Sequence, residues 1–534
     1  MPSFFKQKNA SHSNEKPNDQ QQCELTSTLL SNLKCIQEKT GNSSDIVTQR
    51  FEFGPVKREA ALVYVEGIVK SQSIHQFFSD LLKREHSERE KEQSDLEFIR
   101  EFAAVLGRVT TVYTWKDAFR ALMSGSALFL VDGFSEIITA SAKGGEKRAI
   151  EEPTTQQSVR GQRSGFTESI RTNTALVRRL IKNPDLWVES LQIGNVTKTD
   201  VSIMYINGLA KEKIVEEVRK RLKKIDIDSI LESGYIEQLI EDETITTFPT
   251  IYHTERPDIV AGNLLEGRIA IFVDGTPFVL LAPAVFIQFF QAVEDYYSRF
   301  DIATALRFLR VLIFLISLVA PAIFIAGVTF HQEMIPTSLL ITIAAQREAV
   351  PFPAFVEALI MEIAFEILRE AGIRLPRTIG SAVSIVGAVV IGQAAVQAGI
   401  VSPAMVIIVA FTAIASFATP SFAIAISVRL LRFILMVLSA MFGMYGIILG
   451  LIVIIVHLCS LRSFGVPYMS PLAPLVPGNA GDTIVRMPWW SLRQRPRLMG
   501  SRNTTRQGSR KRPLPPASRN MTSDQGKNGD QNEG

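Results

Sequence analysis

The sequence holds few of the residues that build disulfide frameworks or metal sites. It has three cysteines among 534 residues, and Cys23, Cys35 and Cys459 do not have the spacing of a metal-ligand motif. An odd number of cysteines in a mostly cytoplasmic chain also argues against a disulfide framework, so we expect reduced thiols. Residues 51–300 lack a GxxxxGK[ST] phosphate loop, a paired-histidine metal motif and a GxSxG nucleophile turn. We therefore predict a protein that is not an enzyme and that uses no cofactor or metal ion.

Residues 1–50 lack the apolar core of a secretory signal and are rich in Ser, Asn, Gln and Lys, so we expect a disordered polar tail there. The first run long enough to span a bilayer lies at about 308–330, and the region before it is expected in the cytoplasm. Residues 463–534 are expected to form a cytoplasmic, Pro-rich and basic tail. This tail either touches anionic membrane lipid or is solvated without a partner. No nucleic-acid partner is expected.

Two pairs of similar segments indicate an internal duplication. ALVYVEGIVK at 61–70 matches VSIMYINGLAK at 201–211, and ALFLVDGF at 127–134 matches IAIFVDGT at 269–276, with nearly constant spacing. Each copy has a strand that ends in Gly, an amphipathic helix and a later strand that ends in Asp-Gly. We predict an α/β cytoplasmic region of two repeated subdomains, with subdomain 1 and a linker helix at 51–195 and subdomain 2 at 196–300.

The Asp-Gly pairs predict tight β-hairpins at Asp132 and Asp274. Between the two copies, RSGFTESIRTNTALVRRLIKN at 163–183 predicts a helix with a cluster of basic side chains, namely Arg171, Arg178, Arg179 and Lys182. Two interpretations are open for this cluster. It forms a solvated helix face, or it contacts another subunit, because Arg forms bidentate pairs with carboxylates.

The later part of the sequence predicts an all-α, multi-span membrane domain at 301–462. Four segments are apolar and long enough to cross a membrane, at about 308–330, 378–401, 403–426 and 433–460. The segment 338–372 is partly apolar and is expected to be re-entrant or amphipathic. Three pairs of basic residues favour the inside of the membrane, namely Arg307 and Arg310, Arg374 and Arg377, and Arg429 and Arg432. Four simple spans and a cytoplasmic tail cannot satisfy all three pairs.

The predicted span 378–401 carries small residues at every fourth position, which form one ridge along a helix: Gly380, Ser384, Ala388 and Gly392. Such a ridge lets helices approach closely within lipid. Gln393 and Gln397 are poorly suited to lipid and would hydrogen-bond across an interface. The ridge predicts tight helix packing, and the alternative is that this span lines an aqueous path.

The stretch FVEALIMEIAFEILREAGIRLP at 355–376 predicts an amphipathic helix with an acidic stripe. Glu362, Glu366 and Glu370 lie on one side of this helix together with Arg369. Ionised carboxylates in lipid are costly, so the stripe must face water, protein partners or Arg. The helix lies at the membrane surface, or its stripe faces a pore or polar cavity like the carboxylate rings of cation channels.

Several longer phrases resemble the GerA family, the A subunits of the nutrient germinant receptors of endospore-forming bacteria. The similarity covers about 43–497 and includes FTESIRTN at 166–173, TERPDIVAGNLLEGRIAIFVDGTPFVLLAP at 254–283, FPAFVEALIMEIAFEILREAGIRLP at 352–376, VGAVVIGQAAVQAGIVSP at 386–403 and FGVPYMSPLAP at 464–474. Phrases of this length are far more specific than short motifs.

The resemblance implies a multi-pass protein of the spore inner membrane that works with a transporter-like, nutrient-binding B subunit and a lipoprotein C subunit. It also implies a homo-oligomer, with A subunits that form the part through which monovalent cations leave when nutrient binds, which triggers germination. Two other classes stay open at this point. One is a stand-alone secondary transporter, and the other is a membrane signalling scaffold that does not conduct ions.

Overall fold

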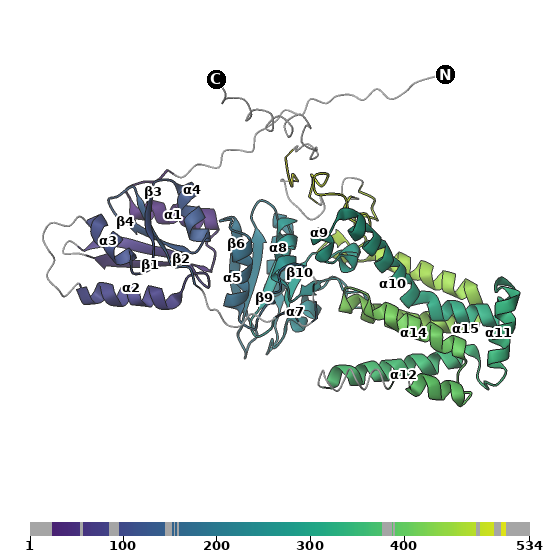
Figure 1. Ribbon diagram of the computed structural model, residues 1–534. Helices are drawn as coiled ribbons and strands as arrows, with labels where there is room; N and C mark the ends of the chain where they lie inside the picture. The colour runs from purple at the N-terminus through teal and green to yellow at the C-terminus, as the bar shows by residue number, and fades with distance from the viewer. Residues whose placement is uncertain are drawn as a thin grey trace, which may run out of the picture.

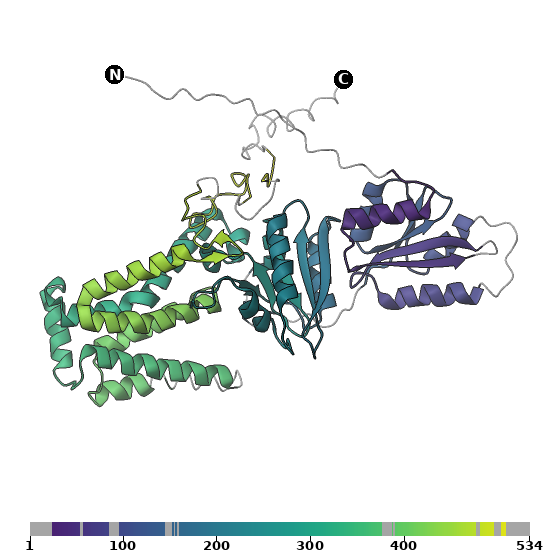
Figure 2. The ribbon, with the colours of Figure 1, turned by 180° about the vertical axis from the view of Figure 1, so that it is seen from behind.

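The computed structural model describes residues 24–53, 57–84, 95–144, 152–153, 155–156, 158, 160–375, 387, 390–476, 481–495 and 504–508. Three parts lie in a row (Figure 1), and Figure 2 shows the same row from behind. They are an α/β unit (unit 1, 24–144), a second α/β unit (unit 2, 166–290) and a helical region (294–460). The C-terminal segment (461–508) returns to unit 2.

Unit 1 is a five-stranded antiparallel sheet with helices on both faces. Its elements are α1 (Leu29–Thr40), β1 (Ile46–Phe53), β2 (Arg58–Val65), α2 (Ser71–Arg84), α3 (Asp95–Ala103), β3 (Val109–Val112), α4 (Trp115–Met123), β4 (Ser126–Val131) and β5 (Ile137–Ser141). The strand order is β1-β2-β4-β5-β3. Side chains alternate along β2, so that Leu62 packs with α2 and α3 while Val63 packs with α1 and α4.

Unit 2 repeats this arrangement element by element. It contains α5 (Ile170–Leu180), β6 (Leu186–Ile193), β7 (Thr199–Ile206), α6 (Glu212–Lys224), α7 (Ser233–Ile240), β8 (Tyr252–Thr254), α8 (Pro257–Leu265), β9 (Ile269–Val273) and β10 (Val279–Ala282). The strand order β6-β7-β9-β10-β8 corresponds strand for strand to that of unit 1. The α/β region with two sheets is therefore confirmed, and the two sheets have the same topology.

The two Asp-Gly turns show how closely the units correspond. Each lies between two antiparallel strands, β4 and β5 or β9 and β10, as the sequence predicted. Each aspartate also accepts a hydrogen bond from the first amide of a helix. Asp132 accepts from the backbone N–H of Leu29 at 2.9 Å, and Asp274 accepts from that of Ile170 at 3.0 Å. A carboxylate here satisfies an N–H that has no partner within the helix.

Two expected boundaries are wrong. Residues 24–50 are not part of a disordered tail, because α1 buries Leu29, Leu33 and Ile36 against the sheet of unit 1. These residues form one apolar helix face within a polar stretch. The linker helix and the strand after it belong to unit 2 and not to 51–195, since β6 pairs with β7 along its whole length.

The basic cluster of α5 joins the two units within one chain. The guanidinium of Arg178 is fully buried and donates to both carboxylate oxygens of Asp45, at 2.7 and 2.9 Å. Arg171 lies 3.1 Å from Glu66, and Arg179 donates to the carbonyl of Gly67 at 3.2 Å. The solvated-face interpretation is wrong for Arg178, which is buried against unit 1, whereas Arg171 contacts unit 1 from an exposed position. Lys182 and Arg171 are the exposed members of this cluster.

The helical region contains two helices that are long and apolar enough to cross a membrane, α10 and α15, among the residues that the structure describes. Its elements are η1 (Phe286–Phe290), α9 (Glu294–Tyr297), α10 (Phe300–Thr329), η2 (Gln332–Met334), α11 (Thr337–Arg347), α12 (Ala354–Arg374), α14 (Pro403–Phe417) and α15 (Phe422–Ser460), followed by strands β11 (Arg462–Ser463) and β12 (Val466–Pro467). The expected span 403–426 is not one helix, because α14 ends before Pro420 and α15 begins after it.

Helix α15 is a hairpin of two antiparallel arms and not a single span at 433–460. Gly443 interrupts it with a backbone of φ 59° and ψ −140°. A Cβ built on Gly446 would lie 2.2 Å from the carbonyl oxygen of Leu438, which is possible only if the chain folds back. At the other end, Ser427 of the first arm bonds to the carbonyl of Thr247, and His457 of the second arm lies 2.9 Å from Thr246. Both ends of the hairpin therefore contact unit 2.

One apolar core continues from unit 2 into the helical region. Phe272 and Leu281 of the sheet belong to the same cluster as Phe290 of η1 and Phe314 of α10. The rings of Phe290 and Phe314 meet edge to face with centroids 5.0 Å apart. Unit 2 is thus fused to the first apolar helix through packing.

Candidate functional site

The acidic stripe of α12 faces arginines of α15. Arg432 donates to Glu362 at 2.6 Å, and Arg429 donates to Glu366. The side chain of Glu362 is 6% exposed and that of Arg432 is 3% exposed. Buried charges of this kind are stable only when they are paired. The first arm of α15 therefore runs antiparallel to α12, and their ion pairs hold the two helices together.

Arg369 links the stripe to α14. It donates to the Ser416 hydroxyl at 2.7 Å, its guanidinium lies 4.7 Å from the centre of the Phe417 ring, and it lies 3.6 Å from Glu366. The cluster thus has three arginines and two glutamates. The described residues offer no hydrogen-bond partner to Glu362 Oε1 or to Nε and Nη2 of Arg432. Glu370 lies apart from the cluster in an exposed pair with Arg374, with N–O contacts of 2.5 and 2.7 Å.

Glu357 is a further buried carboxylate that the sequence did not single out as a site residue. It is fully buried, accepts from Arg347 at 3.0 Å and accepts from the backbone N–H of Ser402 at 2.8 Å. It therefore joins the end of α11 and the start of α12 to the start of α14. Because Ser402 lies near the start of α12 and Ser416 near Arg369, α12 and α14 run in the same direction. The one feature of the sequence that pointed to Glu357 was its place as a Glu in an apolar segment.

The remaining predicted site residues lie on the segment that precedes α14. Gly392 is buried, and a Cβ built on it would lie 3.5 Å from Val406 of α14. Gln393 and Gln397 are exposed and make no hydrogen bond within the described part of the chain. The other three members of the small-residue ridge, Gly380, Ser384 and Ala388, lie outside the described residues.

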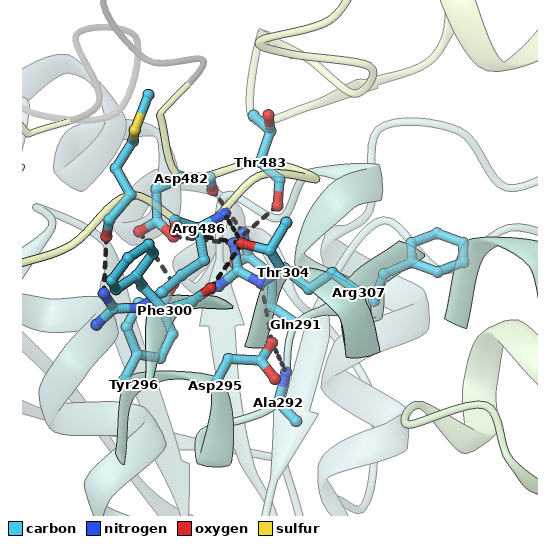
Figure 3. A network of polar contacts seen from close by, with 12 residues as sticks. Gln291, Ala292, Asp295, Tyr296, Phe300, Thr304, Arg307, Asp482, Thr483 and Arg486 are labelled. Carbon is cyan, nitrogen blue, oxygen red and sulfur yellow. Dashed lines mark hydrogen bonds and ion pairs between the residues drawn. The ribbon is translucent and has the colours of Figure 1, made fainter. Parts of the chain in front are cut away.

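A second polar network joins unit 2, α10 and the C-terminal segment (Figure 3). At its centre the fully buried Asp295 accepts from Arg307 at 2.9 Å and from Arg310 at 2.8 Å. Arg307 also donates to Asp482 at 3.0 Å, and Tyr296 donates to the same carboxylate at 3.1 Å. Burial raises the pKa of Asp482 above its usual value of 3.8, and Arg307 opposes that increase.

The network holds the C-terminal segment in place. The Thr304 hydroxyl bonds to the backbone N–H of Arg486 at 3.1 Å and to its carbonyl at 3.3 Å. Arg506 donates to Glu266 of unit 2 at 2.6 Å. The described residues of 463–508 are therefore not a free tail, which corrects the expectation for this part. The partner of Arg307 could not be read from the sequence, since Asp482 is 175 positions away.

No group of three or more His, Cys, Asp or Glu side chains in the described residues is placed to hold a metal ion. Both clusters consist of arginines and carboxylates that pair with each other. Such an arrangement links helices to one another and to the C-terminal segment.

Comparisons with known proteins agree with these features. The model of the Bacillus/Clostridium GerA spore germination protein family matches residues 34–498. The chain is 58% identical over 544 residues to spore germination protein KA of Bacillus subtilis (strain 168), which covers 100% of both chains. It is 47% identical over 483 residues to the uncharacterized membrane protein YfkQ of the same organism, with 90% of this chain and 92% of that protein covered.

A solved structure is also similar in sequence. The crystal structure of the N-terminal domain of the A subunit of the Bacillus megaterium spore germinant receptor GerK3 is 53% identical, and it covers 50% of this chain and 99% of that chain with a TM-score of 0.40. The family match and the full-length relative decide the classification: the chain belongs to the GerA family of spore germination proteins.

Proposed function

We propose that the protein is the A subunit of a nutrient germinant receptor in the spore inner membrane. It assembles with copies of itself, with a nutrient-binding B subunit and with a lipoprotein C subunit, and it releases monovalent cations when the B subunit binds nutrient. The observation that carries the receptor assignment is the 58% identity over the whole length to a spore germination protein. The membrane location is supported by the apolar helices α10 and α15.

We propose six membrane crossings, and the directions of the described helices support this number. We assign them to α10, α12, the segment 378–401, α14 and the two arms of α15. The hairpin supplies the extra crossing that four simple spans lacked. With it, the first two pairs of basic residues and the C-terminal segment lie on the inner side in this proposal, as charge statistics for membrane proteins favour, while Arg429 and Arg432 lie within the crossings and pair with α12. Arginines of α15 neutralise the carboxylates of α12, which lowers the free-energy cost of placing this helix across the membrane.

The polar path for ions is supported best by Gln393 and Gln397. Both side chains are exposed in a single chain, and their neighbours Ile391 and Ile400 are apolar and exposed as well. Exposed amides in such a segment require a polar environment, which copies of the chain around a central path would provide. Glu362, Glu366 and Arg369 then hold helices together beside this path, and the ridge of Gly380, Ser384, Ala388 and Gly392 packs against α14.

Potassium efflux from liposomes tests the proposal. Efflux is measured for the full-length chain alone and for its complex with the B and C subunits, before and after nutrient is added. We expect nutrient-dependent efflux from the complex. Efflux that the chain drives alone by coupled exchange would favour a secondary transporter, and an assembled complex without efflux would favour a signalling scaffold.

A matched pair of variants locates the path. Gln393→Leu replaces an amide that faces the proposed path, and Ala394→Leu adds the same side chain one position along the same exposed segment. We expect nutrient-dependent efflux to fall several-fold in Q393L and to fall less in A394L, with equal assembly on size-exclusion chromatography. Equal efflux from both variants and from the wild-type complex would exclude Gln393 from the path.

A further inference from the structure

A cavity of about 440 Å³ lies where unit 2, α9 and the C-terminal segment meet. Its floor is formed by α8 and η1, and Trp489, Arg495 and Arg506 of the C-terminal segment cover it. The volume falls within the range of about 300–1,000 Å³ that is typical of small-molecule sites. No part of the proposed ion path contributes to its walls.

The walls combine aromatic rings with a few hydrogen-bonding groups. Tyr296, Tyr297 and Trp489 contribute rings, and Asn263 and Gln288 contribute side-chain amides. Flat rings with polar groups at their edges bind planar apolar groups and orient them. Trp489 is 51% exposed, so this ring is accessible from solvent.

The carboxylates in the walls are already paired. Asp258 accepts from Arg256 at 2.7 Å and from the hydroxyl of Tyr297 at 2.9 Å. Glu266 accepts from Arg506 at 2.6 Å. A cationic ligand would therefore compete with strong contacts that exist within the chain.

Two further guanidinium groups line the walls. Arg495 donates to the backbone carbonyls of Leu265 and Thr505, at 2.8 and 2.5 Å, and Arg268 is the buried one. Its side chain is 4% exposed, donates to the amide oxygen of Gln288 and lies 3.9 Å from Glu266, too far for a hydrogen bond. Its Nε has no hydrogen-bond partner among the described residues. Burial lowers the pKa of Arg268 below its usual value of 12.5, which indicates a charge that the surrounding groups compensate only in part.

We infer that this cavity binds a small aromatic monocarboxylate. The carboxylate pairs with Arg268, and the ring lies against Tyr296, Tyr297 and Trp489. The buried guanidinium of Arg268, which is compensated only in part, matches one carboxylate, and the pair is strong because it forms away from water. The ligand would sit beside the network of Figure 3, since Tyr296 both lines the cavity and donates to Asp482. The site is thus placed to change how firmly unit 2 is joined to α10.

Calorimetric titration of the full-length protein in detergent tests the inference. Phenylacetate is the probe, and phenylacetamide is its uncharged analogue of the same shape. We expect saturable binding of phenylacetate at millimolar concentrations and binding of phenylacetamide weaker by about tenfold or more, because the amide lacks the charge that pairs with Arg268. Equal affinities for the two compounds, or no binding of phenylacetate, would overturn the proposal.

Variants assign the binding to this cavity. Trp489→Ala should weaken phenylacetate by about tenfold through loss of ring contact, while Trp490→Ala, which changes the adjacent exposed ring outside the cavity, should bind as the wild type does. Arg268→Gln should abolish the preference for the carboxylate over the amide. If R268Q does not fold, the two tryptophan variants still decide, and unchanged binding in W489A would refute the site. The readout does not require ion release, so it stands apart from the proposed function.

Discussion

Unit 1 keeps the cores on both faces of its sheet largely to itself, with only Ala175 of α5 added to one of them, whereas unit 2 shares one of its two cores with the helical region. In unit 1, one cluster lies under α2 and α3 and the other under α1 and α4. In unit 2, the cluster under α6 and α7 stays largely within the unit, but the cluster under α5 and α8 extends to Phe314 and beyond. Two copies of one fold have therefore acquired different neighbours while they retain the same strand order.

The corresponding turns of the two units show the same divergence. Gly67 and Gly208 follow equivalent strands and have nearly identical backbones, with φ of 77° and 78°. Helix α5 packs against Gly67, but no atom lies within 4 Å of a Cβ built on Gly208. Among the described residues, the close contact that α5 makes at Gly67 thus has no counterpart at the Cβ position of Gly208.

The largest expected effect breaks the contact between the units. Arg178→Gln leaves the carboxylate of Asp45, whose side chain is 9% exposed, without its cation. Loss of one partner of a buried ion pair costs about 3–5 kcal/mol of stability. Hydrogen exchange should increase at the amide of Ser44, which donates to Val188 across the contact. Differential scanning calorimetry and exchange mass spectrometry measure the two effects.

Gln37 supplies the control for this variant. It occupies the position of Arg178 in unit 1, by the offset of 141 residues that relates Asn32 to Asn173, and it is exposed. Gln37→Ala should change stability by no more than about 0.5 kcal/mol. If R178Q and Q37A behave alike, the buried pair does not hold the units together.

A smaller effect separates the two glycines. Alanine at either position is strained by about 1 kcal/mol or more, because both backbones are left-handed. Gly67→Ala adds a clash, since the new Cβ would lie 2.8 Å from that of Ala175 and 3.0 Å from the carbonyl oxygen of Arg171. We expect G67A to be less stable than Gly208→Ala by about 1–3 kcal/mol. Thermal unfolding of both variants tests this, and equal losses would show that the contact with α5 is loose.

The smallest effect concerns pH and is confined to unit 2. Burial lowers the pKa of His253, but the carboxylate of Glu237, 3.7 Å from Nδ1, outweighs burial and raises that pKa above its usual 6.5. Because the folded pKa is the higher one, the pair stabilises unit 2 below pH 6.5, and this stability is lost as the pH rises through the folded pKa. The loss should be about 0.2–1 kcal/mol.

Unit 1 has Thr111 at the equivalent position, since Thr111 pairs with Ile138 as His253 pairs with Leu280. Amide exchange is measured at several pH values and corrected for intrinsic exchange rates. We expect the stability of unit 2 to depend on pH in the wild type and not to do so in the variant His253→Thr. A pH dependence that persists in H253T would assign it to other groups.

The duplicated fold could be predicted from the sequence because strands, helices and Asp-Gly turns recur in register. The start of unit 1 could also have been found, because Leu29, Leu33 and Ile36 follow the helical period, but the polar composition around them suggested a tail. The reversal in α15 is harder to predict from the sequence, since both arms are apolar and a hydropathy profile does not show where the chain turns back. Gly443, Gly446 and Gly450 were its available signal.

The sequence predicted the kind of partner that the charges of the candidate site need, but not the particular residues that supply it. The charges of α12 required water, a protein partner or Arg, and Arg is what they contact. The particular pairs join positions 63 and 70 residues apart on different helices, and such pairing depends on packing that the helical period does not encode. For the same reason, the sequence identified Arg307 as a charge at the start of a span but not the carboxylates that bind it.

The hairpin of α15 has a mechanical consequence. Its base is fixed to unit 2 at Thr246 and Thr247, while its tip at Gly443 packs on Phe330 and His331 after α10. Each arm is a rigid rod about 24 Å long, at a rise of about 1.5 Å for each of about 16 residues. A tilt of about 5° at the base therefore moves the tip by about 2 Å. A small rotation of unit 2 therefore becomes a displacement at the tip of the hairpin that is large enough to repack side chains.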